Sequence, residues 1–335
     1  MRKIIVILGL LSISYHSSAQ WEMIWNDEFN NSILDNSKWI NDVGGNGWGN
    51  NEAQFYTAGS ANLTMNNGFA TITAKAQQLG SNQYTSAKII SKNLFDVKYG
   101  KIEGRMKCPM GKGLWPAFWM LGSNIDTVSW PQCGEIDIME HINNEPKIHG
   151  TAHWNNVGHQ YLGGIINTDP TLFHTYSIVW DANSIKWYMD DQLYYILNIS
   201  NNTNGTEEFH KKFYLILNLA VGGNWPGYPD ASTVFPAEFV IDYIRVYKPA
   251  VAATDELLAS SIELVPNPAD QTIQLISNFS NESFSNGQLW SMEGRFVQSI
   301  DFIASLIDIQ HLEKGTYFIS FEVNGKQVVK QFLKQ

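Results

Sequence analysis

The stretch Gly134-Glu135-Ile136-Asp137-Ile138-Met139-Glu140-His141 alternates acidic and aliphatic side chains with the period of two that is typical of a β-strand. On such a strand Glu135 and Asp137 share one face, and the two isoleucines point to the other face, toward the core. Strict alternation would place Glu140 on the core face, where an unpaired carboxylate is costly. We therefore expect a β-bulge near Met139, which would return Glu140 to the face of the other two carboxylates.

Three carboxylates on one short piece of sheet provide the groups that retaining glycoside hydrolysis requires. One carboxylate attacks the anomeric carbon, and a second, about 5–5.5 Å away, donates a proton to the leaving oxygen and later activates water. Asp137, between the two glutamates, can orient the nucleophile, and its charge helps to keep Glu140 protonated near neutral pH. The spacing alone leaves two alternatives open, a solvated acidic strand edge and a calcium-binding face.

Aromatic side chains flank this cluster in the sequence. In the segment Gly113 to Leu121, Trp115, Ala117 and Trp119 share one strand face. Two indoles on the carboxylate side of a neighbouring strand would form a floor on which sugar rings stack. Downstream, His153 lies on a further strand, although a lone histidine is more often structural than functional.

The rest of the chain favours an all-β fold. Short apolar runs, many of them alternating, are separated by Gly, Asn, Asp and Pro, and no long segment has a 3.6-residue period. This pattern predicts a sandwich or barrel with little helix. The clearest runs are 69–74, 88–91, 101–107, 176–180, 186–190, 213–219 and 239–247.

Composition limits the partners of the protein. The 335 residues are 44% apolar and include 12 Trp, of which we expect about half to fill a core and the others to contact sugars. The formal net charge of −10 argues against nucleic acid as a partner and is compatible with a neutral polymer such as glucan.

Cys108 and Cys133 match no zinc spacing. They could form one bridge, but we favour free thiols, because nothing in the sequence brings them close.

The chain divides into four predicted parts. Arg2 and Lys3, the apolar run 4–11 and the small residues 17–19 have the pattern of a secretory signal peptide over residues 1–19, and the run is too short to span a membrane. Residues 20–249 form the predicted catalytic domain, 250–261 a linker and 262–335 a second β-module. We expect a secreted or cell-surface protein.

The carboxylate motif resembles the bulged E-I-D-x-x-E signature of glycoside hydrolase family 16, in the form found in laminarinases and related β-1,3-glucanases. Four further segments resemble the same group in the same order, so that the likeness covers about residues 21–248. The resemblance implies a concanavalin A-like β-jelly roll with a concave cleft, Glu135 as nucleophile, Asp137 as its helper and Glu140 as acid/base. The four segments are Trp48 to Thr57, Tyr84 to Ala87, Trp115 to Leu121 and Val221 to Gly227.

The same resemblance suggests residues that contact substrate. It places Trp115 and Trp119 beside the scissile bond, and His153 on the leaving-group side. Lys88 stands where the laminarinase pattern usually has Arg, whose planar fork of donors Lys lacks, so the glucan preference could differ. Contacts to neighbouring sugars are implied for three more residues, each with a local alternative: Asn50 (a turn residue), Glu52 (a local salt bridge) and Trp225 (packing at the cleft lip).

Family members also often bind one structural calcium ion. The matching positions are Glu28, the backbone of Gly68, and Asp242, and hard oxygen ligands suit calcium. We expect no cofactor in catalysis.

The C-terminal module resembles the sorting domain recognised by the type IX secretion system, which implies export by that machinery. A small carbohydrate-binding β-domain is the alternative, but the module has a single tryptophan, Trp290, and so lacks an obvious aromatic platform. The resemblance is carried by Pro266-Asn267-Pro268, Gly294-Arg295, Leu312 to Tyr317, and the basic last strand with Lys330 and Lys334.

These observations predict a secreted, monomeric, retaining endo-β-1,3-glucanase, with mixed-linkage β-1,3/1,4-glucan as a second candidate substrate. Two alternatives stay open: a glycan-binding jelly roll without activity, and a hydrolase of the same fold acting on a galactan such as agar. A binding protein has no need for Glu135, Asp137 and Glu140 together, and a sulfated substrate would favour basic residues, of which the matching segments contain few.

Overall fold

The computed structural model describes residues 21–249, 261–277, 284–292, 294–302, 306–323 and 326–335. The predicted signal peptide and nearly all of the predicted linker lie outside these residues. The chain forms two compact units, one ending at Pro249 and the other occupying the C-terminal part. No helix within the described ranges is long and apolar enough to cross a membrane.

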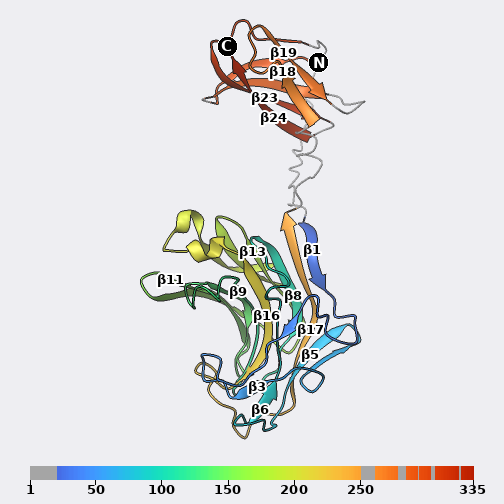
Figure 1. Ribbon diagram of the computed structural model, residues 1–335, viewed down its shortest axis with the longest axis vertical. Helices are drawn as coiled ribbons and strands as arrows, with labels where there is room; N and C mark the ends of the chain where they lie inside the picture. The colour runs from blue at the N-terminus through green and yellow to red at the C-terminus, as the bar shows by residue number, and fades with distance from the viewer. Residues whose placement is uncertain (1–20, 250–260, 278–283, 293, 303–305, 324–325) are drawn as a thin grey trace, which may run out of the picture. The chain divides into compact units, whose positions relative to one another are not determined.

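The first unit is built from two antiparallel sheets, which confirms the predicted all-β jelly-roll sandwich (Figure 1). Its eight-stranded sheet has the order β15-β14-β13-β8-β17-β5-β4, with β1 paired to β17. These strands are β1 (Trp21–Asp27), β4 (Leu63–Asn66), β5 (Phe69–Ala74), β8 (Gly100–Lys107), β13 (His174–Trp180), β14 (Ser184–Met189), β15 (Gln192–Asn198) and β17 (Ala237–Pro249).

The second sheet has seven strands in the order β12-β11-β10-β9-β16-β7-β2 and is visibly curved in Figure 1. A parallel pair and two 3-10 turns complete the unit. The strands of the sheet are β2 (Ile40–Asn41), β7 (Lys88–Ile90), β9 (Leu114–Gly122), β10 (Glu135–Glu140), β11 (Lys147–Asn155), β12 (His159–Asn167) and β16 (Phe213–Val221); the remaining elements are β3 (Gln54–Tyr56), β6 (Tyr84–Ser86), η1 (Ser200–Asn202) and η2 (Glu207–His210).

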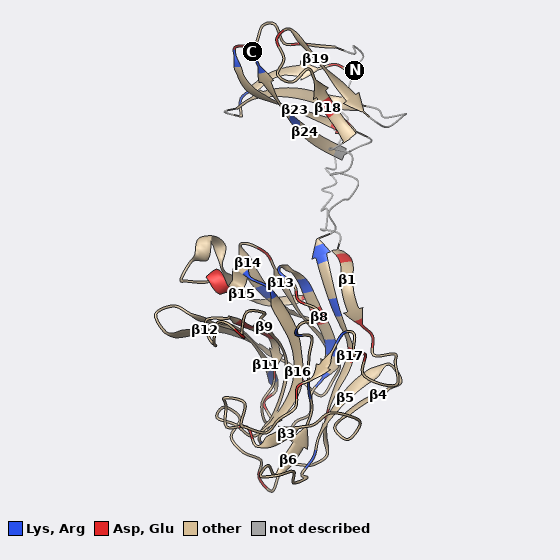
Figure 2. Ribbon diagram, in the orientation of Figure 1, with Lys and Arg blue, Asp and Glu red and all other residues tan. Residues whose placement is uncertain are grey.

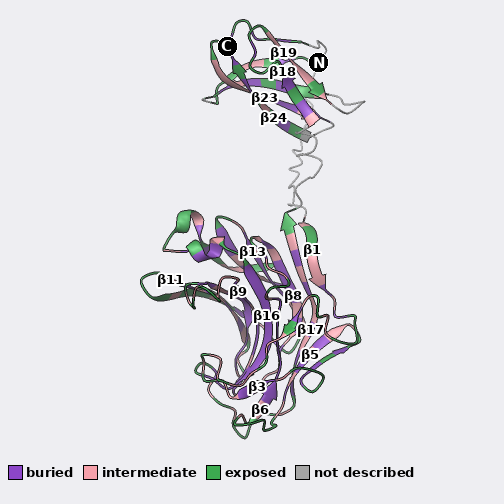
Figure 3. Cartoon of the chain, in the orientation of Figure 1, coloured by how far each residue is buried: buried purple, intermediate pink, exposed green. Residues whose placement is uncertain are grey.

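The core lies between the two sheets, where alternate side chains of each strand meet. Figure 3 shows the middle strands β9, β16 and β8 as largely buried, and every residue of β16 is buried. Phe118 and Met120 of β9 point into this core and are completely buried, as the alternation in the sequence predicts. Cys108 and Cys133 are both buried and free, which confirms the prediction of unpaired thiols.

The second unit has two small sheets and a core of its own, in agreement with the predicted C-terminal β-domain. Ile273, Leu289 and Phe321 are among the side chains buried in that core. Its strands are β18 (Ile262–Val265), β19 (Thr272–Ser277) and β22 (Ile307–Asp308) in one sheet, and β20 (Phe284–Ser291), β21 (Phe296–Ile300), β23 (Gly315–Val323) and β24 (Lys326–Lys334) in the other.

Candidate active site

A β-bulge in β10 brings the three carboxylates together. Pairing with β9 shifts register between Asp137 and Met139, and pairing with β11 shifts between Asp137 and Glu140. Ile138 and Met139 are both completely buried, so two consecutive side chains enter the core and the next one, Glu140, turns back. The predicted bulge is confirmed, and the carboxylates of Glu135, Asp137 and Glu140 all reach the same cleft.

This cleft has a volume of about 670 Å³ and lies on the face of the seven-stranded sheet that is turned away from the core. All ten residues predicted from the sequence to act in catalysis or substrate binding line it, and so do five of the tryptophans. Tryptophan faces can stack on sugar rings, and a long open cleft admits the interior of a polymer. The five indoles belong to Trp48, Trp115, Trp119, Trp130 and Trp225.

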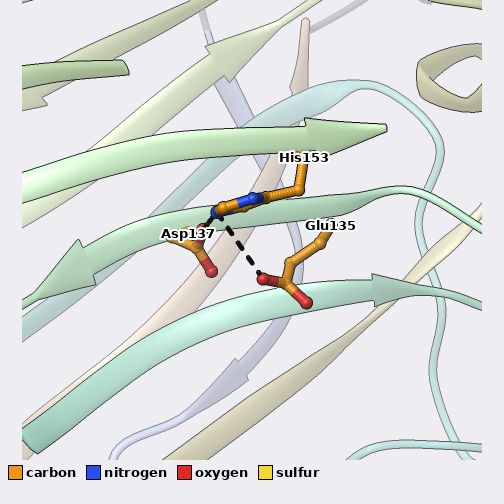
Figure 4. A group of neighbouring side chains, drawn as sticks. All are labelled: Glu135, Asp137 and His153. Atoms are coloured by element: carbon orange, nitrogen blue, oxygen red, sulfur yellow. Dashed lines mark ion pairs between the residues drawn. The ribbon is translucent and has the colours of Figure 1, made fainter. Parts of the chain in front are cut away.

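Glu135 is held between a tryptophan and a histidine. The indole N–H of Trp130 donates a hydrogen bond of 3.1 Å to Oε2 of Glu135. Nε2 of His153 lies 3.9 Å from the other oxygen, Oε1. Figure 4 marks this pair with a dashed line. The two contacts therefore involve different oxygens of the carboxylate.

Asp137 is the most deeply buried of the three, with 3% of the residue exposed. Its Oδ2 lies 3.2 Å from Nε2 of His153, which is ion-pair distance, but the orientation is not that of a hydrogen bond (Figure 4). The indole N–H of Trp187 donates a hydrogen bond of 2.8 Å to the backbone carbonyl of Asp137 from the core side. That bond anchors the strand at the point where the bulge begins.

Glu140 is 7% exposed and accepts a hydrogen bond of 2.9 Å from the indole N–H of Trp115. The ring of Trp115 in turn meets that of Trp225 edge to face, with centroids 5.4 Å apart. The tryptophan predicted to stack on sugar therefore also orients the predicted acid/base.

Burial raises the pKa of all three carboxylic acids. The pKa of Glu135 is raised well above its usual value, first by desolvation and then by the charge of Asp137. Desolvation and, after it, Asp137 raise the pKa of Glu140 to about 8. Desolvation alone raises the pKa of Asp137. The cluster therefore retains protons at pH values where an exposed carboxylic acid has lost them.

These shifts predict the pH profile of a reaction that needs Glu135 ionised and Glu140 protonated. Activity should fall above about pH 8 as Glu140 loses its proton, and the acidic limb should lie above the usual carboxylate range. Asp137→Asn removes a negative charge that raises both pKa values, so both limbs should move to lower pH. Profiles of kcat/KM against pH for the two proteins test this, and limbs that stay in place would contradict it.

Trp130 was not predicted from the sequence. It stands five residues before Glu135, outside any strand, so no period indicates where its side chain points. In the structure its ring lies 4.5 Å from that of His159, between centroids, and its N–H reaches the predicted nucleophile. A tryptophan just before an acidic strand was the available signal.

Trp130→Phe should keep the ring and remove the N–H. The hydrogen bond lowers the pKa of Glu135, so its loss should move the acidic limb of the pH profile to higher pH. A hydrogen bond to a charged group contributes about 1.5–3 kcal/mol, and we expect kcat/KM at the optimum to fall about tenfold to a hundredfold. An acidic limb identical to that of the wild type would show that the bond does not tune Glu135.

A chain of side-chain hydrogen bonds connects the cleft residues Trp119 and Glu52. The Trp119 N–H donates to Asn218 (2.7 Å), whose amide donates to the hydroxyl of Tyr56 (3.1 Å), which donates to Glu52 (3.1 Å). Burial raises the pKa of Glu52. Glu52 accepts hydrogen bonds from the hydroxyl of Tyr56 and, at 2.6 Å, from the side-chain amide of Gln54.

Lys88 and Asn50 lie at the same end of the cleft. The ammonium group of Lys88 forms an ion pair with Asp42 at 3.1 Å and lies 4.2 Å from the ring centre of Trp48. The backbone carbonyl of Asn50 accepts a hydrogen bond of 2.8 Å from the backbone N–H of Asn224. This bond connects two segments of the cleft wall. Their contacts to sugar stay predictions, as do those of the other substrate residues.

Ten further cleft residues were not predicted from the sequence to act in the site. Three of them follow from strand register, because His149 and Thr151 share a face of β11 with His153, and Tyr161 is the partner of His153 on β12. The others are Trp48, Gly49, Tyr56, Ala117, Leu121, His159 and Ala220, in addition to Trp130 and Asn218 above.

The two carboxylates predicted to bind calcium, Glu28 and Asp242, lie beside arginines of the eight-stranded sheet. Figure 2 shows lysine and arginine positions of this sheet in blue. Both oxygens of Glu28 accept hydrogen bonds of 2.8 Å from Arg245, and Asp242 forms an ion pair with Arg105. Each carboxylate that would bind the metal thus already has a guanidinium partner, and calcium would have to displace it. These side chains do not fit the ion as they stand, and calcium at Gly68 stays a prediction.

Comparison with known proteins agrees with this geometry. Residues 47–245 match the family Glycosyl hydrolases family 16, and residues 263–335 match a secretion system C-terminal sorting domain, which marks the protein for export to the cell surface or beyond. The chain is 41% identical over 247 residues to a beta-glucanase of Rhodothermus marinus, covering 69% of this chain and 86% of the relative.

Two further comparisons define the extent of the likeness. The catalytic domain of an endo-1,3-beta-glucanase (laminarinase) from Thermotoga petrophila superposes with a TM-score of 0.66 and 41% identity, covering 70% of this chain and 100% of that one. The clotting factor G alpha subunit of Tachypleus tridentatus is 36% identical over 94% of this chain, which spans 46% of that relative's length. The bulged carboxylate strand, the tryptophan-lined cleft and the family match together place the chain in glycosyl hydrolase family 16.

Proposed function

We propose that this family 16 glycoside hydrolase cleaves internal β-1,3-glucosidic bonds of laminarin-type glucans, with retention of anomeric configuration. The observation that carries the proposal is the bulge of β10, which turns Glu140 into the cleft beside Glu135. The similarity to the Rhodothermus beta-glucanase and to the Thermotoga laminarinase supports a β-glucan as the substrate. Mixed-linkage β-1,3/1,4-glucan is a second substrate to test.

In the first step Glu135 attacks the anomeric carbon and forms a covalent glycosyl-enzyme intermediate. Its carboxylate is held by Trp130 on one oxygen and faces His153 with the other, so the attacking geometry is set before substrate binds. Asp137, next to it, supports the orientation of His153 and adds negative charge to the cluster.

Glu140 gives its proton to the leaving oxygen in the same step. Its pKa of about 8 means that it is protonated at neutral pH, as a general acid must be. Once the leaving sugar has gone, the ionised Glu140 takes a proton from water, and that water releases the glycosyl group from Glu135. Each of the two displacements inverts the configuration of the anomeric carbon, so the configuration is retained overall.

The side chains that line the cleft favour a neutral polymer as the substrate. Its walls are aromatic, and Lys88, the one lysine or arginine among the lining residues, is already paired with Asp42. A sulfated chain would bury charges without partners there, which is costly. We therefore favour neutral glucan over carrageenan.

The test is a product profile on laminarin, lichenan, agarose and carrageenan. We expect a ladder of oligosaccharides from laminarin, early products in the β-configuration by NMR, and no cleavage of carrageenan. Agarose cleavage without laminarin cleavage would replace glucan by galactan as substrate, and early α-products would contradict the assigned roles.

We further propose that the C-terminal unit delivers the enzyme through type IX secretion. The support is the match of residues 263–335 to the sorting domain. Deleting residues 262–335 should leave laminarin hydrolysis intact, because each unit has its own core, and should trap the enzyme inside the outer membrane of the producing cell.

A further inference from the structure

Glu135, Asp137 and His153 present one ligand atom each within 4.8 Å of one another, the one such group among the described residues (Figure 4). We propose that this trio is also a binding site for a divalent first-row transition-metal ion such as Zn²⁺, and that the ion inhibits the enzyme by occupying its catalytic centre. The inhibition, though not the binding, rests on the proposed function.

The distances suit zinc. With metal–ligand bonds of about 2.0–2.2 Å, a tetrahedral ion needs ligand atoms about 3.4 Å apart. Nε2 of His153 is 3.2 Å from Oδ2 of Asp137 and 3.9 Å from Oε1 of Glu135. Small side-chain rotations would close the remaining difference. All three residues line the open cleft, from which water would complete the shell.

Outer partners orient two of the three ligands, His153 and Glu135, as they do in built metal sites. Nδ1 of His153 lies 2.9 Å from Nε2 of His159. When Nδ1 carries the proton and donates it to His159, the lone pair of Nε2 points at the two carboxylates. Trp130 holds Oε2 of Glu135 and leaves Oε1 for the metal.

Asp137 supplies the second, independent observation. It is 3% exposed, and its Oδ2 is buried and accepts no hydrogen bond. A buried carboxylate oxygen without a donor is unusual, because such oxygens are costly to desolvate. A cation between Asp137 and His153 would satisfy it.

The donor set selects the class of ion. One imidazole nitrogen and two carboxylate oxygens suit zinc, copper or nickel, whose affinity rises along the series to copper. Calcium and magnesium demand six or more oxygens and tolerate nitrogen poorly, so the trio should discriminate against them.

The experiment is titration calorimetry of the tag-free, exported protein with zinc chloride in a buffer that does not chelate metal. We expect one ion per molecule, with the affinity at least about 100-fold weaker in His153→Gln, because losing an outer partner alone costs about 10–100-fold. His174→Gln is the matched control: His174 also pairs with an aspartate, Asp190, and its side chain is 15% exposed against 20% for His153, but it lies outside the cleft. The control should bind zinc as the wild type does.

Equal zinc affinity in wild type, His153→Gln and His174→Gln would overturn the site, and so would the absence of binding at millimolar zinc or equal binding of calcium. Glu135→Gln is a second variant, for use if His153→Gln does not fold, and it should also weaken binding. A laminarin assay on the same samples separates the two proposals: if zinc binds the trio yet hydrolysis continues, the metal site stands and the assigned catalytic roles fail.

Discussion

Replacing Glu135 by Gln is expected to lower kcat on laminarin by roughly 10⁴-fold or more, because the neutral amide cannot form the glycosyl-enzyme intermediate. Gln has nearly the shape of Glu and can still accept the hydrogen bond from Trp130 through its amide oxygen. Burial already raises the pKa of Glu135, so losing the charge should not destabilise the fold. Hydrolysis is measured by release of reducing ends, and folding by thermal unfolding.

Glu103→Gln is the matched control for this variant. Glu103 is 7% exposed, as is Glu140, but it lies on β8 of the other sheet, where it pairs with Lys101. It should retain wild-type activity. Substantial laminarin hydrolysis by a folded Glu135→Gln protein would remove Glu135 from the nucleophile role.

Glu140→Ala is expected to lower kcat on laminarin by about 10²–10⁴-fold, which is the usual contribution of a general acid or base. Aryl glycosides with acidic leaving groups need no proton at the leaving oxygen, so the glycosylation step should be nearly as fast on them as in the wild type. The comparison of kcat/KM on laminarin and on an activated aryl β-glucoside oligomer checks this.

The leaving-group comparison is its own control, since both substrates meet the same folded variant. The substitution also leaves the Trp115 N–H without its acceptor, which would impair both substrates alike. An equal loss on both would therefore mean that Glu140 acts through Trp115 or through folding, and not as the acid.

The fold was predictable because strand periodicity is a local property. Alternation around residues 102–106 and within 115–121 places side chains on the core and cleft faces without knowledge of any other segment. Even the bulge at Met139 could be inferred, because the alternative buries Glu140 at a cost that no neighbouring residue offsets. The resemblance then added positions, such as Asn50 and Trp225, that no local period indicates.

Trp130 and His159 were not predictable in this way. Trp130 lies outside the strands and His159 is the first residue of β12, so the direction of each side chain depends on how a loop returns to the sheet. Their contacts to Glu135 and His153 exist only in three dimensions. The guanidinium partners of Glu28 and Asp242 are likewise distant in sequence, and they change what the proposed calcium residues can do.

The sequence by itself determined the strands, the face of each side chain and the three carboxylates, because these depend on the two-residue period of a β-strand and on the cost of burying charge. Only the tertiary structure decided how the carboxylates hold their protons and which outer residues orient them. A pKa depends on desolvation and on charges within a few ångströms, and those neighbours are brought together by sheet packing rather than by order along the chain.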